Sequence, residues 1–410
     1  MPEFFKVVTP QQVFDMMAGF SRLAFERIDL EHSLGRVLGL DVVSKEDLPP
    51  RARATMDGYA VRAVDTFGAS DTVPALFKTV GRVSMGSLPD MIIAQGQAAE
   101  IPTGGFLPEG ADAVVMVEYT NPVADGEIEV TRPVTKGDNV LDRAGDVALG
   151  EVVLKAGKRL RPQDIGILAA LGMVKISVFK KPKVAIISTG DEIVPVMQTP
   201  SLGQIRDINS YAIRALVETV GAAPISCGII RDEPKLLKGS LKNALDTADV
   251  VVISGGSSVG ERDYIVDVIS SFSQAEIYAH GIAISPGKPT LLAGVSGKPV
   301  FGLPGHPVSA LIVAQVFVLP FIKYLEGENL VKEPSGQRVS AVLATPVHSP
   351  HGREDYVRVK LMRRNNQLLA YPVFGKSGMM STLVKADGFF VVPIHTEGMA
   401  DGEAIDVYLF

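Results

Sequence analysis

Two unbroken apolar runs constrain the fold of this chain more than any other feature. Residues 183–188 (Lys-Val-Ala-Ile-Ile-Ser) and 249–254 (Asp-Val-Val-Val-Ile-Ser) have no polar face, which is typical of strands buried on both sides. Helix-like segments at 210–220 and 235–248 flank a third strand-like run at 226–230. Strands that alternate with helices of about 10 to 15 residues predict a doubly wound α/β domain with a parallel sheet.

The rest of the 410 residues must form further domains, because single cores rarely grow past roughly 250 to 300 residues. Short β-like runs broken by Gly and Pro predict a β-rich domain at 47–146, inserted into an N-terminal linking domain. After a polar linker, short alternating strands predict a C-terminal β-barrel. The expected fold class is multidomain α/β plus β. Its boundaries are 1–46 with 147–180 (linking), 47–146 (inserted), 181–328 (α/β) and 335–410 (barrel).

The linking domain has local signals of its own. Thr9-Pro-Gln-Gln12 combines a capping residue, a proline at the first helical position and a glutamine three residues after the cap. These residues predict a helix that runs to about Phe25. Residues 36–43 and 152–154 look like strands that can rejoin each other, and 162–171 looks like a helix.

Composition excludes several classes of protein. The formal net charge of −6 argues against a nucleic-acid partner, since such proteins usually need a basic surface to displace counterions. The single cysteine, Cys227, excludes an internal disulfide and fits a reducing cytoplasm. No signal-peptide pattern opens the chain, and the most apolar stretch, residues 308–321, falls short of the roughly 20 residues that a membrane span needs. We therefore expect a cytoplasmic protein that binds neither nucleic acid nor membrane.

A turn rich in glycine and serine follows the second buried run. Residues 253–263 read Ile-Ser-Gly-Gly-Ser-Ser-Val-Gly-Glu-Arg-Asp. Ligands of open α/β sheets bind beyond the carboxyl ends of the strands, where backbone N–H groups can hold phosphate. Asp263 could add a carboxylate for Mg²⁺. The alternative is a tight turn without a ligand. Candidate substrate-binding residues here are Ser254, Gly255, Gly256 and Ser257.

A second polar segment, Ser188-Thr-Gly-Asp-Glu192, ends the first buried run and should reach the same sheet edge. Two acidic groups, Asp191 and Glu192, beside phosphate-binding turns suggest a metal-bridged phosphate or a pyrophosphate under attack. The alternative is that Asp191 caps a helix.

Two loops rich in proline and glycine offer groups for an oxyanion. Ser285-Pro-Gly-Lys-Pro-Thr290 supplies Lys288, and Gly302-Leu-Pro-Gly-His-Pro-Val-Ser309 supplies Ser309 at a helix start. Proline after Lys288 and the wrong glycine spacing exclude a Walker motif. His306 is more often a turn or capping residue than a ligand, and the six histidines show no metal-ligand spacing.

An ordered set of motifs spans nearly the whole chain. The motifs are Thr55-Met-Asp-Gly-Tyr-Ala-Val61, Ile101-Pro-Thr-Gly-Gly105 with Gly110-Ala-Asp-Ala-Val-Val115, Ser254-Gly-Gly-Ser-Ser-Val-Gly260, Pro286-Gly-Lys-Pro289 with Gly302-Leu-Pro-Gly305, Gly352-Arg-Glu-Asp-Tyr356 and Lys376-Ser-Gly378. Together they resemble the molybdopterin molybdotransferase family, which includes MoeA and the gephyrin E domain.

The resemblance implies an enzyme of molybdenum cofactor biosynthesis. Members bind adenylylated molybdopterin, insert molybdate into its dithiolene and release AMP with Mg²⁺ present. The implied assembly is a homodimer whose α/β domain resembles MogA and whose C-terminal domain is a β-barrel. A MogA-type adenylyltransferase is the implied partner.

Roles follow from the resemblance only where a motif matches. Asp263 and Glu192 would be the catalytic and metal-linked acids, and Asp57 and Thr103 would act from the β-rich domain. The remaining substrate-binding positions would be Asp207 and Asp232 in the same cleft, and Lys288, Ser309, Arg353 and Ser377 around the oxyanion.

The chain departs from the family pattern at three places. Ser285 stands where a lysine is usual, and His306 stands where an asparagine is usual. Ala144-Gly-Asp146 replaces Gly-Glu-Asp, so Asp146, which the resemblance implies as a further site residue of the β-rich domain, is a weaker candidate than Asp57 and Thr103. One cationic donor is therefore missing, unless a protonated His280 compensates. The departure leaves molybdate and tungstate both open as the substrate.

Two other functions fit the same sequence. Molybdopterin adenylyltransferase activity would consume ATP with Mg²⁺ and accumulate adenylylated pterin without molybdate. A non-catalytic scaffold or regulator of cofactor assembly would keep its biological activity after Asp263→Asn.

Overall fold

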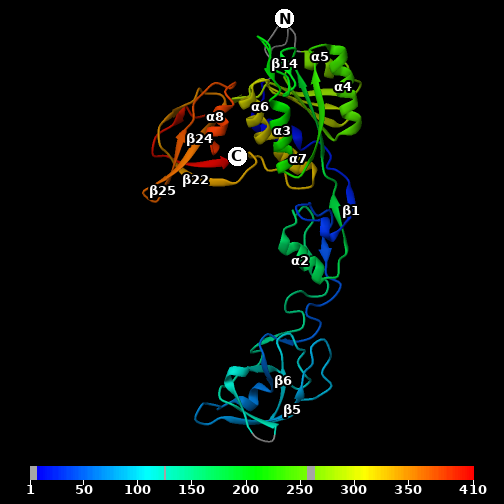
Figure 1. Cartoon of the computed structure of the whole chain (residues 1–410), viewed down its shortest axis with the longest axis vertical. Coiled ribbons are helices and arrows are strands. Elements are labelled where there is room, and N and C mark those ends of the chain that lie inside the picture. Colours follow the sequence, from blue (N-terminus) through cyan, green and yellow to red (C-terminus); the bar gives the residue numbers. More distant parts are fainter. Residues whose placement is uncertain (1–6, 124–125, 256–263) are drawn as a thin grey trace. The chain divides into compact units, whose positions relative to one another are not determined.

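The computed structural model describes residues 7–123, 126–255 and 264–410. The chain divides into two compact units (Figure 1). The larger unit comprises Met1–Gly39, Gly157–Pro162 and Lys175–Phe410, and the smaller comprises Leu40–Ala156 and Gln163–Val174. Because the smaller unit comes from the middle of the sequence, the larger one is assembled from three separate segments.

The smaller unit is β-rich, as predicted. Its main sheet has six strands in the order β7-β4-β6-β5-β9-β8, and alternate residues of these strands face two separate apolar cores. Ala98 faces one core and Ala99 the other, which is the two-residue period of a strand. The strands of this unit are β2 (Val42–Val43), β3 (Arg53–Ala54), β4 (Gly58–Val61), β5 (Ala75–Arg82), β6 (Gln97–Ile101), β7 (Ala113–Met116), β8 (Thr120–Pro122), β9 (Glu127–Val130), β10 (Val140–Leu141) and β11 (Val152–Leu154).

The chain enters and leaves this unit along paired segments. β2 and β11 are antiparallel, with Val43 opposite Val152, and β3 pairs with β10. The predicted rejoining of residues 36–43 with 152–154 is therefore confirmed at Val42 and Val43. The helix α2 (Pro162–Ala170) agrees with the predicted helix at 162–171.

The larger unit contains a six-stranded sheet in the order β16-β13-β17-β21-β20-β18. β16, β13, β17 and β21 are parallel, as predicted. β20 runs in the opposite direction, and β18, which pairs antiparallel with β20, runs in the same direction as the parallel strands. The strands are β13 (Lys183–Thr189), β16 (Ala223–Ile230), β17 (Val250–Ser254), β18 (Ala275–His280), β20 (Leu291–Val295) and β21 (Lys298–Leu303), with the short pair β14 (Ile193–Val194) and β15 (Ile205–Arg206) beside them.

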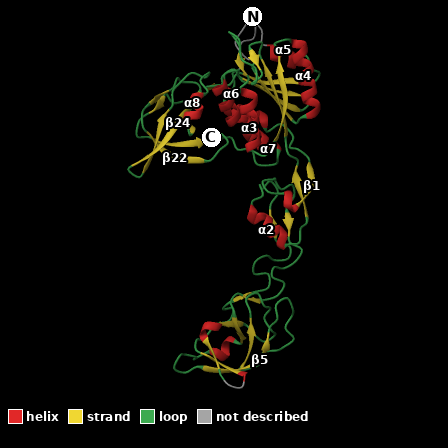
Figure 2. Ribbon diagram, viewed as in Figure 1, coloured by secondary structure: helices red, strands yellow, loops and turns green. Residues whose placement is uncertain are grey.

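Helices cover both faces of this sheet (Figure 2). In β13, Val184 and Ile186 join the core that contains α1 and α3, whereas Ala185 and Ile187 join the core that contains α4 and α5. This alternation explains why the strand sequences are apolar throughout. The helices are α1 (Pro10–Met17), α3 (Asn209–Thr219), α4 (Pro234–Thr247), α5 (Tyr264–Ser270), α6 (Pro307–Val313) and α7 (Leu319–Leu325).

α6 and α7 form one helical run through a π-helical segment, Ala314–Val318. The run Pro307–Leu325 has 19 residues and a mean hydropathy of 2.0, so it is long and apolar enough to cross a membrane. However, 83% of it is buried inside the protein, where it packs in the core of the α/β domain. This is the core helix that the sequence predicts.

The C-terminal strands close into a five-stranded barrel. Its order is β24-β25-β22-β28-β26, and β26 pairs back onto β24. A short strand of the α/β domain, β19 (Ile284–Ser285), adds to β24 in parallel. The barrel elements are β22 (Arg338–Leu343), β24 (Glu354–Arg364), β25 (Gln367–Pro372), β26 (Gly388–Val392) and β28 (Ala404–Leu409), with β23 (Val347–His348), β27 (Gly398–Met399) and α8 (Ser381–Lys385) beside them.

Two local predictions are wrong in extent. The first helix has the expected capping box at Thr9 but ends at Met17, and Phe25–Asp29 forms strand β1, paired with β12 (Lys175–Phe179). Gly19 disfavours continuation of the helix by about 1 kcal/mol, and the segment beyond it finds a strand partner. The predicted strand at 36–43 is reduced to β2, because Val37 and Leu38 make only isolated bridges to different segments.

Candidate functional site

The carboxyl ends of three parallel strands meet at one edge of the α/β sheet. Ser188 at the end of β13 lies opposite Ser254 at the end of β17, and Ser254 lies opposite Leu303 at the end of β21. The loops that carry Glu192, Gly255 and the Gly-Leu-Pro-Gly motif all leave from this edge. The predicted convergence of these loops is therefore present.

Gly255 is required by the close approach of two backbones. Its φ is +110°, and a Cβ at this position would lie 2.0 Å from the Thr189 carbonyl oxygen. A side chain is excluded, so the turn after β17 brings its backbone directly over the end of β13. Three predicted site residues of this loop, Gly256, Ser257 and Asp263, lie outside the described residues.

Two carboxylates at the edge hold neighbouring loops. Asp207 is buried and accepts hydrogen bonds from the Ser188 hydroxyl, at 3.1 Å to each carboxylate oxygen, and from the backbone N–H and hydroxyl of Ser210. Asp232 accepts a hydrogen bond of 2.6 Å from the Thr189 hydroxyl. Asp207 also lines a cavity of about 380 Å³, between the β14 loop and α3.

The acidic pair after β13 is exposed and does not begin a helix. Asp191 accepts a hydrogen bond of 3.3 Å from the backbone N–H of Asp232, and the chain continues into β14. The alternative that Asp191 caps a helix is therefore wrong. Glu192 folds back over the chain, since a Cβ on Gly190 would lie 2.8 Å from its carboxylate.

Asn209 links this edge to the next loop. Its side-chain N–H₂ donates to the Ser254 hydroxyl at 2.7 Å and to the Gly305 carbonyl at 2.8 Å. Asn209 is 8% exposed, and its Oδ1 has no hydrogen-bond partner within the described ranges. The β17 and β21 loops are thus fixed to each other through one buried amide.

The four predicted oxyanion residues come together around one cavity. Lys288, Ser309, Arg353 and Ser377 all line a space of about 490 Å³ between the α/β domain and the barrel. Lys288 is exposed and Ser309 is buried. The pairing of β19 with β24, with Ser285 opposite Asp355, holds the lysine loop beside the arginine.

Three further polar side chains of the cavity wall, those of Asp355, Arg358 and His306, were not among the predicted oxyanion residues. Asp355 is buried and lies 2.8 Å from Arg353 Nε, and the Ser349 hydroxyl also donates to it at 2.8 Å. Arg358 is buried and donates to the Thr382 hydroxyl at 2.7 Å and to the Gly375 carbonyl at 2.9 Å. Burial lowers the pKa of Arg358, but a guanidinium remains charged in proteins.

The third of these side chains is His306. Its Nδ1 lies 2.9 Å from the Ser377 hydroxyl oxygen. His306 occupies the N-cap position of α6, but within the described residues its side chain makes no capping bond. His306 therefore lies in the turn before α6, as expected, but its side chain bonds to Ser377 and not to the helix. His280, suggested as a compensating cation, is not among the described residues that line the cavity.

Sequence signals for these residues are weak. Asp355 lies inside the Gly-Arg-Glu-Asp-Tyr motif, and Arg358 is a cation inside an apolar strand pattern, Tyr-Val-Arg-Val. An arginine in such a pattern must find buried hydrogen-bond partners, so the pattern indicates a polar contact inside the protein. The partners of Arg358 come from a different loop and from α8, so the sequence alone does not identify them.

Asp57 and Thr103 meet in the smaller unit. The backbone N–H of Thr103 donates to Asp57 Oδ1 at 2.6 Å, and its hydroxyl donates to the same oxygen at 2.8 Å. The backbone bond is the larger of two causes that lower the pKa of Asp57. Both residues are exposed, so the pair forms an ionised acceptor on the surface of its own unit.

Known proteins resemble the whole chain. Family models of the MoeA N-terminal region (domain I and II), a probable molybdopterin binding domain and the MoeA C-terminal region (domain IV) match residues 8–172, 185–324 and 340–410. A putative molybdopterin biosynthesis protein of Methanocaldococcus jannaschii is 35% identical over 392 residues, covering 94% of this chain and 92% of that protein. A molybdopterin molybdenumtransferase of Staphylococcus aureus is 32% identical over 386 residues, covering 93% and 90%.

A solved structure has the same fold. The crystal structure of a molybdopterin biosynthesis MoeA protein from Pyrococcus horikoshii OT3 matches with a TM-score of 0.84 and 31% identity, covering 99% of this chain and all of that one. The match confirms the predicted fold class, with the probable molybdopterin-binding domain at the position of the α/β sheet. From the order of the three matched regions and the near-complete coverage, the chain belongs to the MoeA family.

Proposed function

We propose that this chain is a molybdopterin molybdenumtransferase, which inserts molybdate into adenylylated molybdopterin and releases AMP. Relatives with that name match nearly the whole chain. The observation that carries the proposal is the cavity lined by Lys288, Ser309, Arg353 and Ser377. These residues come from four separate loops and helices, and the cavity is where they meet.

The charges of this cavity suit a tetrahedral dianion. Lys288, Arg353 and Arg358 supply three positive charges and Asp355 one negative charge, so these four side chains carry a formal net charge of about +2. Ser309 and Ser377 add hydroxyl donors. A charge-assisted hydrogen bond contributes roughly 1.5 to 3 kcal/mol, so a lysine, an arginine and two hydroxyls suffice for selective binding of an oxyanion.

The sheet edge suits the phosphates of the nucleotide. Ser254 and Gly255 begin the turn whose backbone N–H groups would bind phosphate. We assign Asp207 and Asp232 to the same cleft, where Asp207 acts mainly by fixing Ser188 and Ser210. The amide of Asn209 holds this turn against the loop that enters the oxyanion cavity, so the two halves of the substrate would bind to neighbouring loops.

Mg²⁺ fits this cleft only if the protein and the substrate both supply its ligands. Within the described residues, no group of three or more His, Cys, Asp or Glu side chains could hold a metal ion. Mg²⁺ usually binds through one or two carboxylates plus substrate phosphates, and Glu192 with Asp263 would provide the carboxylates. When bound, the ion would neutralise charge on the diphosphate. Glu192 would act on the phosphate through this ion, since two anionic groups repel each other without it.

The smaller unit would contribute Asp57 and Thr103. We propose that the protein is a homodimer in which this pair acts at a partner's cleft, and that a MogA-type adenylyltransferase supplies the substrate. The four-domain division at 1–46 with 147–180, 47–146, 181–328 and 335–410 belongs to the same proposal, as does a cytoplasmic location.

Release of AMP tests the function. Purified protein is incubated with adenylylated molybdopterin and Mg²⁺, with molybdate, with tungstate or with neither oxyanion. The expected result is AMP release that depends on one oxyanion and is lost in Asp263→Asn. Oxyanion-independent AMP release, or no release with either oxyanion, would remove the proposal. Consumption of ATP in place of adenylylated molybdopterin would favour the adenylyltransferase.

A further inference from the structure

His306 and Ser377 form a hydrogen-bonded pair on the wall of the oxyanion cavity. The distance between His306 Nδ1 and the Ser377 hydroxyl oxygen is 2.9 Å, and both residues line the cavity with Lys288 and Arg353. The pair joins the α/β domain to the barrel loop at 373–378. The backbone supports the same contact, because the N–H of Val308 donates to the Ser377 carbonyl at 3.0 Å.

The direction of this hydrogen bond depends on whether His306 Nδ1 carries a proton. If Nδ1 carries no proton, it accepts the Ser377 hydroxyl proton, and that hydroxyl cannot donate to a ligand. If Nδ1 carries a proton, as it does in the cation and in one neutral tautomer, Nδ1–H donates to the Ser377 oxygen and the hydroxyl proton is free to turn toward the cavity. Of these two forms only the cation also brings a positive charge to a ligand. A hydroxyl has one proton, so the two arrangements exclude each other.

Within the described residues, the cavity wall beside His306 carries more cations than carboxylates. The charged groups from neighbouring elements are Lys288 on the loop after β19, Arg353, Asp355 and Arg358 at β24, and Lys376 next to Ser377. His348 is the other titratable imidazole on the cavity wall. Cations outnumber carboxylates here, whereas a bound dianion would reverse the local balance and favour protonation.

We propose that oxyanion binding in this cavity is coupled to the uptake of one proton by His306, which releases the Ser377 hydroxyl to the ligand. The inference rests on the proposed function, because it requires the oxyanion to bind in this cavity. His306 thereby acts as a specificity-determining residue for a dianion. It supplies a positive charge at the ligand and makes a hydrogen-bond donor available at the same time.

The test is the affinity for molybdate, and separately for tungstate, measured by calorimetry on the full chain. Binding should be about tenfold tighter at about pH 6 than at about pH 8, the range in which imidazoles titrate. Repeating the titration in two buffers with different heats of ionisation should reveal net proton uptake at about pH 7. Ser377→Ala should weaken binding strongly at the lower pH and only slightly at the higher pH, where the hydroxyl is already occupied.

Two histidine variants separate the proposal from other sources of pH dependence. His306→Asn keeps an amide that can bond to Ser377 but cannot be protonated, so it should lose both the pH dependence and the proton uptake. His348→Asn removes the other imidazole on the wall and should keep both. A pH dependence that survives in His306→Asn, or one that is lost in His348→Asn, would overturn the proposal.

Failure of this inference differs from failure of the proposed function. Oxyanion-dependent AMP release together with pH-independent oxyanion binding would contradict only the proton uptake by His306 and would leave the proposed function in place. Absence of oxyanion binding at millimolar concentration at both pH values would remove the oxyanion site and with it the role of His306.

Discussion

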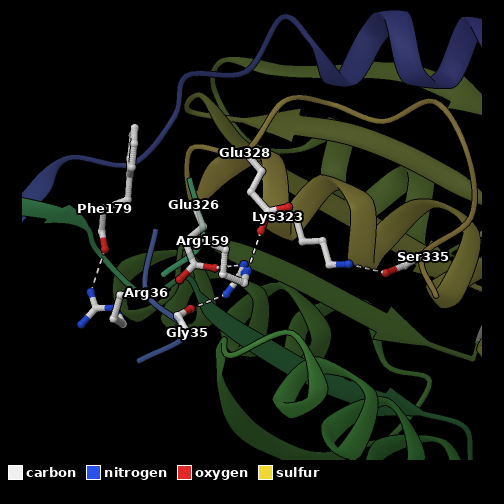
Figure 3. Close-up of polar contacts among 8 residues, drawn as sticks. All are labelled: Gly35, Arg36, Arg159, Phe179, Lys323, Glu326, Glu328 and Ser335. Carbon is white, nitrogen blue, oxygen red and sulfur yellow. Dashed lines mark hydrogen bonds and ion pairs between the residues drawn. The ribbon is translucent and has the colours of Figure 1, made fainter. Parts of the chain in front are cut away.

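Arg159 and Glu326 form an ion pair with 2.7 Å between Nη2 and Oε2, and the Glu326 side chain is only 1% exposed. Figure 3 shows Arg159 between the Gly35 carbonyl and the two carboxylates of Glu326 and Glu328, with Lys323 extending away to Ser335. Nearby, Arg36 donates to the Phe179 carbonyl at 2.7 Å. Arg159 therefore connects the segment at 157–162 to the end of α7 within the larger unit.

Removal of this arginine should destabilise the larger unit strongly. Arg159→Met leaves the buried carboxylate of Glu326 without its cation, and breaking a buried ion pair from one side costs about 3 to 5 kcal/mol. The matched control is Lys332→Met, since Lys332 lies 2.6 Å from Asp15 but both side chains are about half exposed. That change should cost about 0 to 1 kcal/mol. Urea unfolding measures both, and equal losses would contradict a special role for burial.

The same pair makes a prediction about pH. Burial raises the pKa of Glu326 above its ordinary 4.5, while Arg159 acts in the opposite direction. Because the pKa of Glu326 is raised in the folded state, the stability that this carboxyl contributes is fully present below pH 4.5. That stability is lost as the pH rises through the pKa that Glu326 has in the folded protein. The glutamine side chain in Glu326→Gln does not titrate. The urea unfolding midpoint of this variant should therefore rise relative to that of the unmodified protein as the pH rises from about 4 to about 7. A constant difference across that range would mean that folding does not shift the pKa of Glu326, contrary to this prediction.

The turn after β17 predicts a different kind of damage. Gly255→Ala places a Cβ 2.0 Å from the Thr189 carbonyl and forces a non-glycine residue to a φ of +110°, so it should cost more than about 2 kcal/mol. AMP release should fall with it, because the phosphate turn must move. In Gly239→Ala, within α4, no described atom lies within 4 Å of the added carbon, and stability should rise by up to about 1 kcal/mol. Similar midpoints for both variants would contradict the close approach.

Local patterns in the sequence predicted much of this fold. The runs at 183–188 and 249–254 were identifiable as doubly buried strands because both faces of β13 and β17 meet apolar cores. The parallel order of the sheet then brought Ser188 and Ser254 to one edge. The cluster of Lys288, Ser309, Arg353 and Ser377 was predicted from the family resemblance, since nothing local joins residues so far apart in sequence.

What the sequence did not predict depends on contacts between distant segments. Arg159 and Glu326 are 167 positions apart, and neither has a local signal that specifies the other. The sequence predicts a short hairpin between the loops at 285–290 and 302–309, and β20 with β21 confirms it. The pairing of β18 with β20 joins segments that no local pattern connects. The contact between His306 and Ser377 requires the barrel to dock on the α/β domain, which is a tertiary event.

The smaller unit offers a test at Asp57. Its pKa is lowered first by the Thr103 backbone N–H and then by the Thr103 hydroxyl. Thr103→Val removes only the hydroxyl, so the pKa of Asp57 should rise part of the way toward its ordinary 3.8, as followed by carboxyl NMR. A carboxyl group whose pKa is lowered in the folded state stabilises the fold above 3.8, and this stabilisation is lost as the solution becomes more acidic. In an acid titration the variant should therefore unfold at a slightly higher pH than the unmodified protein. An unchanged Asp57 titration would mean that the hydroxyl bond is not formed in solution.

Lys288 should separate charge from shape in the oxyanion cavity. Lys288→Ala removes one charge-assisted hydrogen bond of about 1.5 to 3 kcal/mol, so molybdate affinity should fall roughly tenfold to a hundredfold. Lys288→Arg keeps the charge and should recover part of the affinity, although a planar guanidinium does not copy an ammonium. The control is Lys242→Ala on the exposed surface of α4, which changes net charge equally and should leave binding unchanged. If Lys242→Ala weakened binding as much as Lys288→Ala, the oxyanion would be responding to the overall charge of the protein and not to a group in the cavity.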